Sequence, residues 1–278
     1  MKKAMVIDSA SLYVRAFFSS KDDEEALRSE SGKLMNAVDF FLHFTKALRK
    51  KPDIMDYDVL FCFESPTPNS WRKTTYPKYK SNRPPMDPDL KYQLKFLRQV
   101  PELFGFQAKD KDGYESDDLI GHFVCSFYNN YDEIILVSSD KDLSGLLRSN
   151  VTMRDPLNKW EARNTEWVLK TFGIDYSQFY FYQALTGDSA DGIPGVHRCG
   201  PKKAVEIVKT YDTAYNLLEN WTKAEAQWPV LKGQKDAFIM AGELVNLKKT
   251  IHHKINPSPP MSVNDKGLED FILTCRTC

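Results

Sequence analysis

The sequence predicts an α/β fold with a mostly parallel central sheet, and two observations lead to this prediction. Short apolar runs alternate with amphipathic helical patterns along the first half of the chain. Three of these runs also end in a carboxylate: Ala4 to Ile7 precedes Asp8, Asp58 to Phe63 precedes Glu64, and Glu133 to Ser139 precedes Asp140. The carboxyl ends of parallel strands meet at one edge of a sheet, so these acids are expected to lie together.

Hydrophobic periodicity predicts the other elements. Helices are expected over about 33–50 and 89–103 and from Glu115 onward, with further strands over 104–109 and, at the sheet edge, over Val151 to Arg154. The rest of the chain is predicted to be helical, with helices over 165–172, 176–185, 202–210, 211–220 and 234–249. Six prolines between 66 and 88 predict an excursion from the core.

Composition narrows the class of protein. The chain has 278 residues, 42% of them hydrophobic, which is enough to bury one large core or two modest ones. It contains no apolar run of the ~20 residues that a membrane span needs, and Asp8 comes too early for a signal peptide. Five scattered cysteines are typical of a reducing compartment, so we expect a cytoplasmic protein. Cys275 and Cys278, with His252 and His253, leave a zinc site as a minor alternative.

The formal net charge is zero, but the basic residues are concentrated in one segment. From Pro66 to Val100 there are eight Lys and Arg residues against only Asp87 and Asp89. Acids committed to metal ions would cancel this charge in the sum while leaving a basic surface for phosphates. Neutrality therefore does not exclude a nucleic-acid partner.

Five carboxylates gather between Tyr114 and Asp142, in Glu115-Ser116-Asp117-Asp118 and in Asp140-Lys141-Asp142. Such a group requires cations, and oxygen ligands partly open to water suit Mg²⁺ or Mn²⁺. The alternative is that the first cluster only caps a helix and complements its dipole.

A glycine-rich stretch from Gly187 to Lys203 lies between two predicted helices. Backbone N–H groups in such a hairpin, followed by Lys202 and Lys203, can bind a phosphate. An ordinary loop with glycine at positive φ is the alternative interpretation.

Five blocks of sequence carry a family resemblance when taken in order. They are Val6-Ile7-Asp8 with Arg15; Trp71-Arg72-Lys73 leading to Tyr79-Lys80 and Arg83; Glu115-Ser116-Asp117-Asp118; Ser139-Asp140-Lys141-Asp142; and Leu185 to Gly195 with Asp188 and Asp191. Together they resemble the 5′-nuclease superfamily, which includes flap endonucleases, the 5′-nuclease domain of bacterial DNA polymerase I and bacteriophage 5′-exonucleases. The Ser-Trp-Arg-Lys sequence is most similar to that of the phage enzymes, and a stand-alone bacterial homologue is the alternative. If the protein is phage-encoded, we expect it in the host cytoplasm.

The resemblance implies a PIN-like core with a helical arch over about 66–103, and a helix-hairpin-helix motif that grips duplex DNA. It implies two or more divalent cations, Mg²⁺ or Mn²⁺, and K⁺ at the hairpin as a further candidate. The implied metal ligands are Asp8, Glu64, Glu115, Asp117, Asp118, Asp140, Asp142, Asp188 and Asp191. Lys80 and Arg83 are implied at the scissile phosphate as catalytic residues, and the implied DNA contacts are Arg15, Arg72, Lys73, Tyr76, Tyr79, Gly195, Arg198, Gly200, Lys202 and Lys203. For Tyr76 and Tyr79, packing within the arch is the alternative to stacking on a base.

Two positions depart from the family pattern. Glu64 stands where an aspartate is usual, so its longer arm changes how it reaches a metal ion. Arg198-Cys199-Gly200 replaces the first of two hairpin glycines, which makes the K⁺ turn less secure.

The predicted function is a metal-dependent 5′ to 3′ DNA exonuclease that also cuts 5′ flaps, with a role in DNA replication, primer removal or genome degradation. Its expected substrate is DNA with 5′ ends or flaps, and the protein is expected to be monomeric, with a polymerase or single-strand-binding protein as candidate partners. The alternatives are a non-cleaving nucleic-acid-binding protein, an RNase acting on RNA–DNA hybrids, and a metal-dependent phosphatase. The expected domains are a nuclease core over 1–186, a helical duplex-binding region over 187–250 and a peripheral tail over 251–278.

Overall fold

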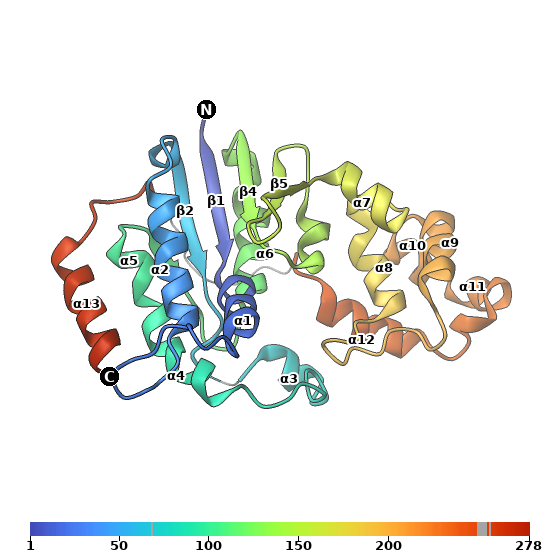
Figure 1. Cartoon of the computed structure of the whole chain (residues 1–278). Helices are drawn as coiled ribbons and strands as arrows, with labels where there is room; N and C mark the ends of the chain where they lie inside the picture. Colours follow the sequence, from blue (N-terminus) through green and yellow to red (C-terminus); the bar gives the residue numbers. More distant parts are fainter. Residues whose placement is uncertain (68, 249–254, 256) are drawn as a thin grey trace.

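The computed structural model describes residues 1–67, 69–248, 255 and 257–278, and its centre is a sheet of strand order β3-β2-β1-β4-β5-β6 (Figure 1). The strands are β1 (Lys3–Asp8), β2 (Tyr57–Cys62), β3 (Gln107–Lys109), β4 (Glu133–Val137), β5 (Val151–Asp155) and β6 (Glu161–Arg163). All neighbours are parallel except β5 and β6, which are antiparallel. The predicted α/β fold is confirmed, but β5 is not the edge strand, because β6 pairs with its outer side.

Successive residues of the central strands bury opposite faces of the sheet. In β1, Met5 and Ile7 join one apolar cluster, whereas Ala4 and Val6 join the other. The first face is covered by α1 (Ser9–Ser20), α2 (Asn36–Arg49), α4 (Pro88–Leu97) and α5 (Gln99–Leu103), and α13 (Asp265–Thr277) packs on the outside of α4 and α5. The second is covered by α6 (Ser116–Phe127), through residues such as Phe123. In the structure the helix predicted over 89–103 is divided into two helices, α4 and α5.

The second apolar cluster continues from the sheet into a group of C-terminal helices on the right of Figure 1. These are α7 (Thr165–Phe172), α8 (Phe179–Thr186), α9 (Pro201–Tyr211), α10 (Ala214–Glu219), α11 (Trp221–Gln227) and α12 (Lys235–Val245). Phe238 of α12 holds them together, since its ring lies 5.9 Å from Phe181 and 5.5 Å from Trp221 between centroids. One continuous core therefore fixes these helices against the sheet.

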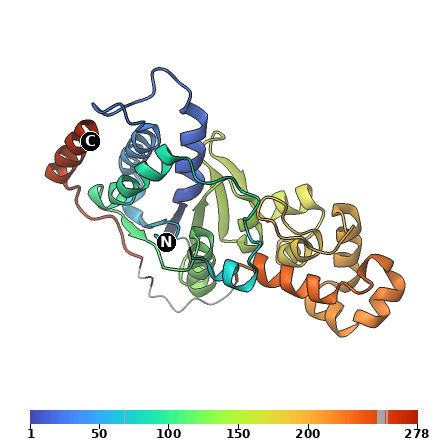
Figure 2. The ribbon, with the colours of Figure 1, turned by 90° about the horizontal axis from the view of Figure 1, so that it is seen from below.

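The basic segment crosses the end of the sheet at which β1, β2 and β4 terminate. It begins with α3 (Trp71–Thr75) and runs without further helix until α4 starts at Pro88. Seen from below, it passes between the sheet and the C-terminal helices (Figure 2). The arch predicted over 66–103 is therefore helical at its two ends and irregular where it crosses the site.

The chain end, predicted to be a peripheral tail, contains α13 and packs against the core. Met261 donates its N–H to the Gly105 carbonyl at 2.7 Å, and Phe271 of α13 packs edge-on against Phe96, with 6.1 Å between the ring centroids. Cys275 is buried in the same core. His252, His253 and the expected boundary at 250–251 lie outside the described residues. None of the helices in the described ranges is long and apolar enough to cross a membrane.

Candidate metal and nucleic-acid site

Asp8 and Glu64 meet at the carboxyl ends of β1 and β2, as predicted. The Asp8 carboxylate caps α1 by accepting the N–H of Ser11 at 3.2 Å, and it accepts hydroxyl hydrogen bonds from Ser116 at 3.0 Å and Ser138 at 2.8 Å. The Ser116 hydroxyl also lies 3.3 Å from Oε1 of Glu64. The longer arm of Glu64 therefore still reaches the group around Asp8.

Burial disfavours the charged form of three acids at this edge of the sheet and raises their pKa values. Burial, and next the Asp140 carboxylate, raises the pKa of Asp8. Burial and the neighbouring Glu115 raise the pKa of Glu64 to about 7, and burial and Asp140 raise that of Asp142 to about 7. Each would release its proton more readily if a cation were bound beside it.

A second acidic group opens α6 and surrounds one buried arginine. Nη1 of Arg72 lies 2.8 Å from Asp118, 3.3 Å from Glu115 and 3.6 Å from Asp117, and the Arg72 side chain is only 2% exposed. Its Nε donates to the Leu244 carbonyl at 2.9 Å. Arg72 thereby ties the acids to α12, and the N–H of Glu115 completes the helix cap on Asp118 at 3.0 Å.

Residues 79–83 of the basic segment lie directly on acids from two parts of the chain. Nζ of Lys80 is 2.8 Å from Glu115, and the Lys80 N–H donates to the Asp191 carbonyl at 2.8 Å. The Tyr79 hydroxyl lies 2.8 Å from Glu115 and 2.9 Å from Asp191, while Arg83 pairs with the Asp191 carboxylate. Although burial raises the pKa of Glu115, Lys80 and Arg72 outweigh it, so that this pKa is lowered.

The third acidic group joins the end of β4 to the hairpin after α8. Nζ of Lys141 bridges Asp142 at 2.7 Å and Asp188 at 3.0 Å, and Gln183 donates to Asp142 at 2.6 Å. Asp140 is exposed, and its carboxylate accepts the N–H of Asp142 at 2.9 Å. The nine predicted acids therefore fall into three neighbouring groups. Arg72 and Lys80 pair with acids of the second group, and Lys141 pairs with acids of the third.

Two predicted DNA contacts need correction. Arg72 and Tyr79 are 2% and 1% exposed, and both are engaged with carboxylates, so neither can hold a strand or stack on a base in this structure. For Tyr79 the packing alternative is the one observed. Lys73 is exposed and Tyr76 is half-buried, so both remain candidates for DNA contact.

We expect Arg72→Ala to lower the free energy of unfolding by about 3–5 kcal/mol, because it leaves Asp118 buried without its cation and removes one of the two cations that contact Glu115. Urea denaturation followed by circular dichroism measures this change. Lys73→Ala is the matched control, since Lys73 is the exposed neighbour and should change stability by less than about 0.5 kcal/mol. Equal stability of the two variants would contradict the role assigned to Arg72.

The predicted hairpin lies between α8 and α9. Gly195 packs so tightly on Gly187 that a side-chain Cβ would come within 2.3 Å of the Gly187 nitrogen. Arg198 adopts φ +62°, the left-handed conformation that glycine adopts most easily, at the position where the sequence departs from the family pattern. Arg198, Gly200, Lys202 and Lys203 are exposed beside the start of α9. Arg15, the remaining predicted contact, pairs with Asp155 at 3.3 Å.

Sequence reasoning missed several polar residues of the site. Trp71 donates from Nε1 to Asp118 at 3.1 Å, and Ser138, Lys141 and Gln183 bind acids as described above. Trp71 could have been suspected from its place beside Arg72. The others have no local signal, because their partners are brought near only by the fold.

Comparison with known proteins gives a consistent result. The family model described as "5′-3′ exonuclease, N-terminal resolvase-like domain" matches residues 3–173, and "5′-3′ exonuclease, C-terminal SAM fold" matches 174–265. The chain is 32% identical to a 5′-3′ exonuclease of Aquifex aeolicus over 89% of this chain and 82% of that protein. It is 30% identical to DNA polymerase I of Bacillus subtilis over 96% of this chain but only 29% of that protein.

The fold is also similar to that of a bacteriophage T5 flap endonuclease solved in complex with DNA and metal ions. The two chains are 19% identical, the TM-score is 0.69, and the match covers 98% of this chain and 99% of the other. At that identity the likeness establishes the fold.

Proposed function

Because this chain belongs to the 5′-3′ exonuclease family, we propose that it hydrolyses phosphodiester bonds at 5′ ends of DNA and at 5′ flaps, in a metal-dependent reaction. The observation that carries the proposal is the contact of Lys80 and Arg83 with Glu115 and Asp191. It places cations from the basic segment at the same edge as the acids. A phosphate reaching that edge would meet positive charge and carboxylate oxygens together.

The acids suit divalent cations in their chemistry. All their donor atoms are carboxylate oxygens, the ligands that Mg²⁺ and Mn²⁺ prefer. Oδ1 of Asp117 is buried and, within the part of the chain that the structure describes, accepts no hydrogen bond. Over the same residues no three acidic, His or Cys side chains converge closely enough to hold one ion, and Lys80, Arg72 and Lys141 pair with acids of these groups.

We assign the metal ligands to the three acidic groups. Glu64 and Asp117 are the donors least satisfied by the described part of the protein, because Glu64 accepts one hydroxyl hydrogen bond, from Ser116, and Oδ1 of Asp117 accepts none. Divalent ions there would supply activation of water and neutralisation of charge on the phosphate oxygens. Lys80 and Arg83 would stabilise the charge that builds on the scissile phosphate, as fixed cations do in other phosphoryl transfers. The hairpin with Lys202 and Lys203 would hold the duplex backbone, with K⁺ as a candidate ion there.

We infer a role in DNA replication and repair, because relatives include DNA polymerase I, in which the matching segment is part of a longer chain. A 5′-labelled duplex and a 5′-flap duplex, incubated with Mg²⁺ and separately with EDTA, test the activity. Release of labelled 5′ products in Mg²⁺ alone is expected. If folded protein releases none from either substrate, the proposed activity is wrong.

Divalent metal should also stabilise the protein, and more so at pH 8 than at pH 5. Glu64 and Asp142 have pKa values raised to about 7, so between the usual carboxyl range and pH 7 the folded chain keeps protons that the unfolded chain has lost. Raising the pH through this window therefore lowers the free energy of unfolding, and the whole of this decrease persists above pH 7. With Mg²⁺ at about 100 times its Kd, Tm should rise by about 5–10 °C at pH 8.

Thermal denaturation at both pH values, with and without Mg²⁺, measures this effect. NaCl at matched ionic strength is the control, because it screens charges without occupying the acidic groups. A Tm that responds equally to NaCl and Mg²⁺ would argue against a specific metal site.

A further inference from the structure

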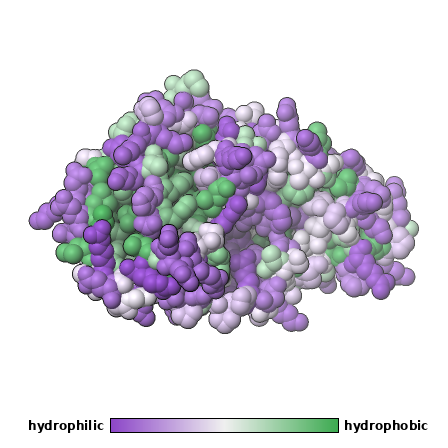
Figure 3. All heavy atoms as spheres, viewed as in Figure 1, coloured by the Kyte–Doolittle hydropathy of each residue, from purple (hydrophilic) through white to green (hydrophobic). Residues whose placement is uncertain are grey.

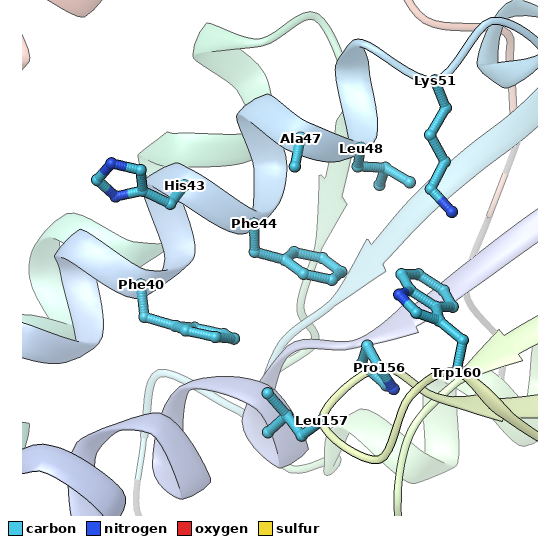
Figure 4. A pocket seen from close by; sticks show the side chains of 9 residues that line it. All are labelled: Phe40, His43, Phe44, Ala47, Leu48, Lys51, Pro156, Leu157 and Trp160. Carbon is cyan, nitrogen blue, oxygen red and sulfur yellow. The ribbon is translucent and has the colours of Figure 1, made fainter.

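An apolar cavity of about 220 Å³ lies between α2 and the hairpin that joins β5 to β6, away from the acids. Apolar residues colour the surface over α2 in Figure 3, and Figure 4 shows the cavity itself. We call it the aromatic slot and define it by Phe40 and Phe44 of α2 and by Pro156, Leu157 and Trp160 of the hairpin. None of these five side chains is fully buried, so the slot is open to solvent.

The three rings are almost parallel. Phe40 and Phe44 have centroids 6.2 Å apart and an interplanar angle of 17°, and Phe44 and Trp160 have centroids 6.4 Å apart and an angle of 14°. Phe40, Phe44 and Trp160 thus form a row of stacked rings, and a planar ligand can extend such a stack better than a branched aliphatic one. A nucleobase is planar and stacks on aromatic side chains whatever its sequence.

The hairpin holds Trp160 in this position at a conformational cost. Lys159 and Trp160 adopt φ +52° and +57°, and the N–H of Glu161 closes the turn on the Asn158 carbonyl at 2.9 Å. Glycine or asparagine is usual at such positions, so a tryptophan there is unexpected on grounds of turn stability alone. Binding of a ligand to the Trp160 ring would explain why this conformational cost is tolerated.

The charge around the slot fits a phosphate. Its lining includes the basic Lys51 and His43 and no acidic residue, and Nζ of Lys51 lies 4.0 Å from the centre of the Trp160 ring. His43 is already paired with Asp39 at 3.4 Å. Lys51 is thus the cation best placed to meet a phosphate beside a stacked base.

Hydrogen bonds connect the slot to the acidic edge. Asp155, which ends β5 before the hairpin, pairs with Arg15 at 3.3 Å and with Arg163 at 3.4 Å. Nη1 of Arg163 donates to the carbonyl of Ser139, the residue before Asp140, at 2.9 Å. The hairpin that carries Trp160 is therefore fixed relative to the site of cleavage.

We propose that the aromatic slot binds one unpaired nucleobase of the single-stranded part of the DNA substrate, with Lys51 beside its phosphate. This proposal rests on the proposed function and adds to it a site that favours substrates with a single strand next to a duplex. An apolar peptide is the competing occupant, and the experiment below separates the two by requiring an aromatic ring.

The test is equilibrium binding by fluorescence anisotropy, in Ca²⁺ and without turnover, of a blunt duplex and of a duplex with a short oligothymidine flap. Trp160→Leu should weaken flap binding about 10-fold and leave the blunt duplex unchanged, since stacking is worth about one to two powers of ten per base. Trp160→Phe should keep most of the affinity. Tyr215→Leu is the matched control, because Tyr215 is 69% exposed on α10, in another part of the surface.

An abasic site, moved along the flap, identifies the bound base. At one position it should weaken binding to the unaltered protein about 10-fold yet add nothing to the loss in Trp160→Leu. Additive losses at every position, equal losses on blunt and flap duplexes, or a leucine as good as phenylalanine would each overturn the proposal. Phe40→Leu repeats the test if Trp160→Leu has a lowered Tm. Because binding is measured without cleavage, these outcomes do not depend on whether the proposed activity is found.

Discussion

Asp140→Asn should lower the rate of phosphodiester cleavage at least about 100-fold while DNA is still bound in Ca²⁺. The Asp140 carboxylate is exposed at the end of β4, and its charge raises the pKa of both Asp8 and Asp142. The charge of Asp140 therefore acts on acids of both the first and the third acidic group. Removing that charge leaves the other acids in place but weakens their combined attraction for a cation.

The substitution is chosen to spare the fold. Asparagine retains an oxygen that can accept the N–H of Asp142, which Asp140 now accepts at 2.9 Å. Single-turnover cleavage, anisotropy and Tm should be measured on the same preparation. Asp236→Asn, an exposed acid of α12, is the matched control and should cleave normally. Undiminished cleavage by Asp140→Asn would remove Asp140 from the metal assignment.

Lys80→Ala should lower the single-turnover rate about 100- to 1,000-fold and weaken DNA binding only modestly. Nζ of Lys80 lies 2.8 Å from Glu115, and the backbone of Lys80 is fixed by Asp191. A cation held in this way costs little to organise when the phosphate arrives. Its contribution should therefore appear in the rate rather than in affinity.

Two control variants separate the effect of the Lys80 ammonium from the effects of backbone conformation and of charge elsewhere in the segment. Lys80 adopts φ +53°, so Lys80→Gly removes the ammonium with no conformational cost and should lose as much rate as Lys80→Ala. Lys78→Ala removes an exposed charge from the same segment and should reduce binding, at most, without changing the rate. If Lys80→Ala weakens binding and leaves the rate intact, its place at the scissile phosphate is wrong.

Much of the fold follows from local patterns. The alternation of Met5 and Ile7 with Ala4 and Val6, and the buried run of β4, predict strands whose carboxyl ends share an edge. The acids at those ends were predicted in sequence, and the structure brings Asp8, Glu64 and Ser116 together there. The sequence prediction missed the short helices α3 and α11, which depend on tertiary packing more than on periodicity, and it also missed the longer helices α1 and α13.

The partners of the acids could not be predicted. Tyr79 and Asp191 are 112 residues apart, and Arg72 and Leu244 are 172 apart. A basic, aromatic segment rich in proline is typical of an exposed DNA-binding surface. Arg72 and Tyr79 of this segment are instead buried against α6 and α12. Whether a cation faces solvent or a carboxylate depends on side-chain placement across the fold.

The sequence by itself determined the fold class and the edge of the sheet at which the acids meet, because strand period and chain order dictate them, and its resemblance to a known family indicated the class of protein. Only the tertiary structure decided how charge is balanced there. It divided the acids into three groups, paired Arg72 and Lys80 with acids of the second group and Lys141 with acids of the third, and formed the aromatic slot from α2 and a distant hairpin. These features depend on contacts between residues far apart in the chain, which local propensity does not encode.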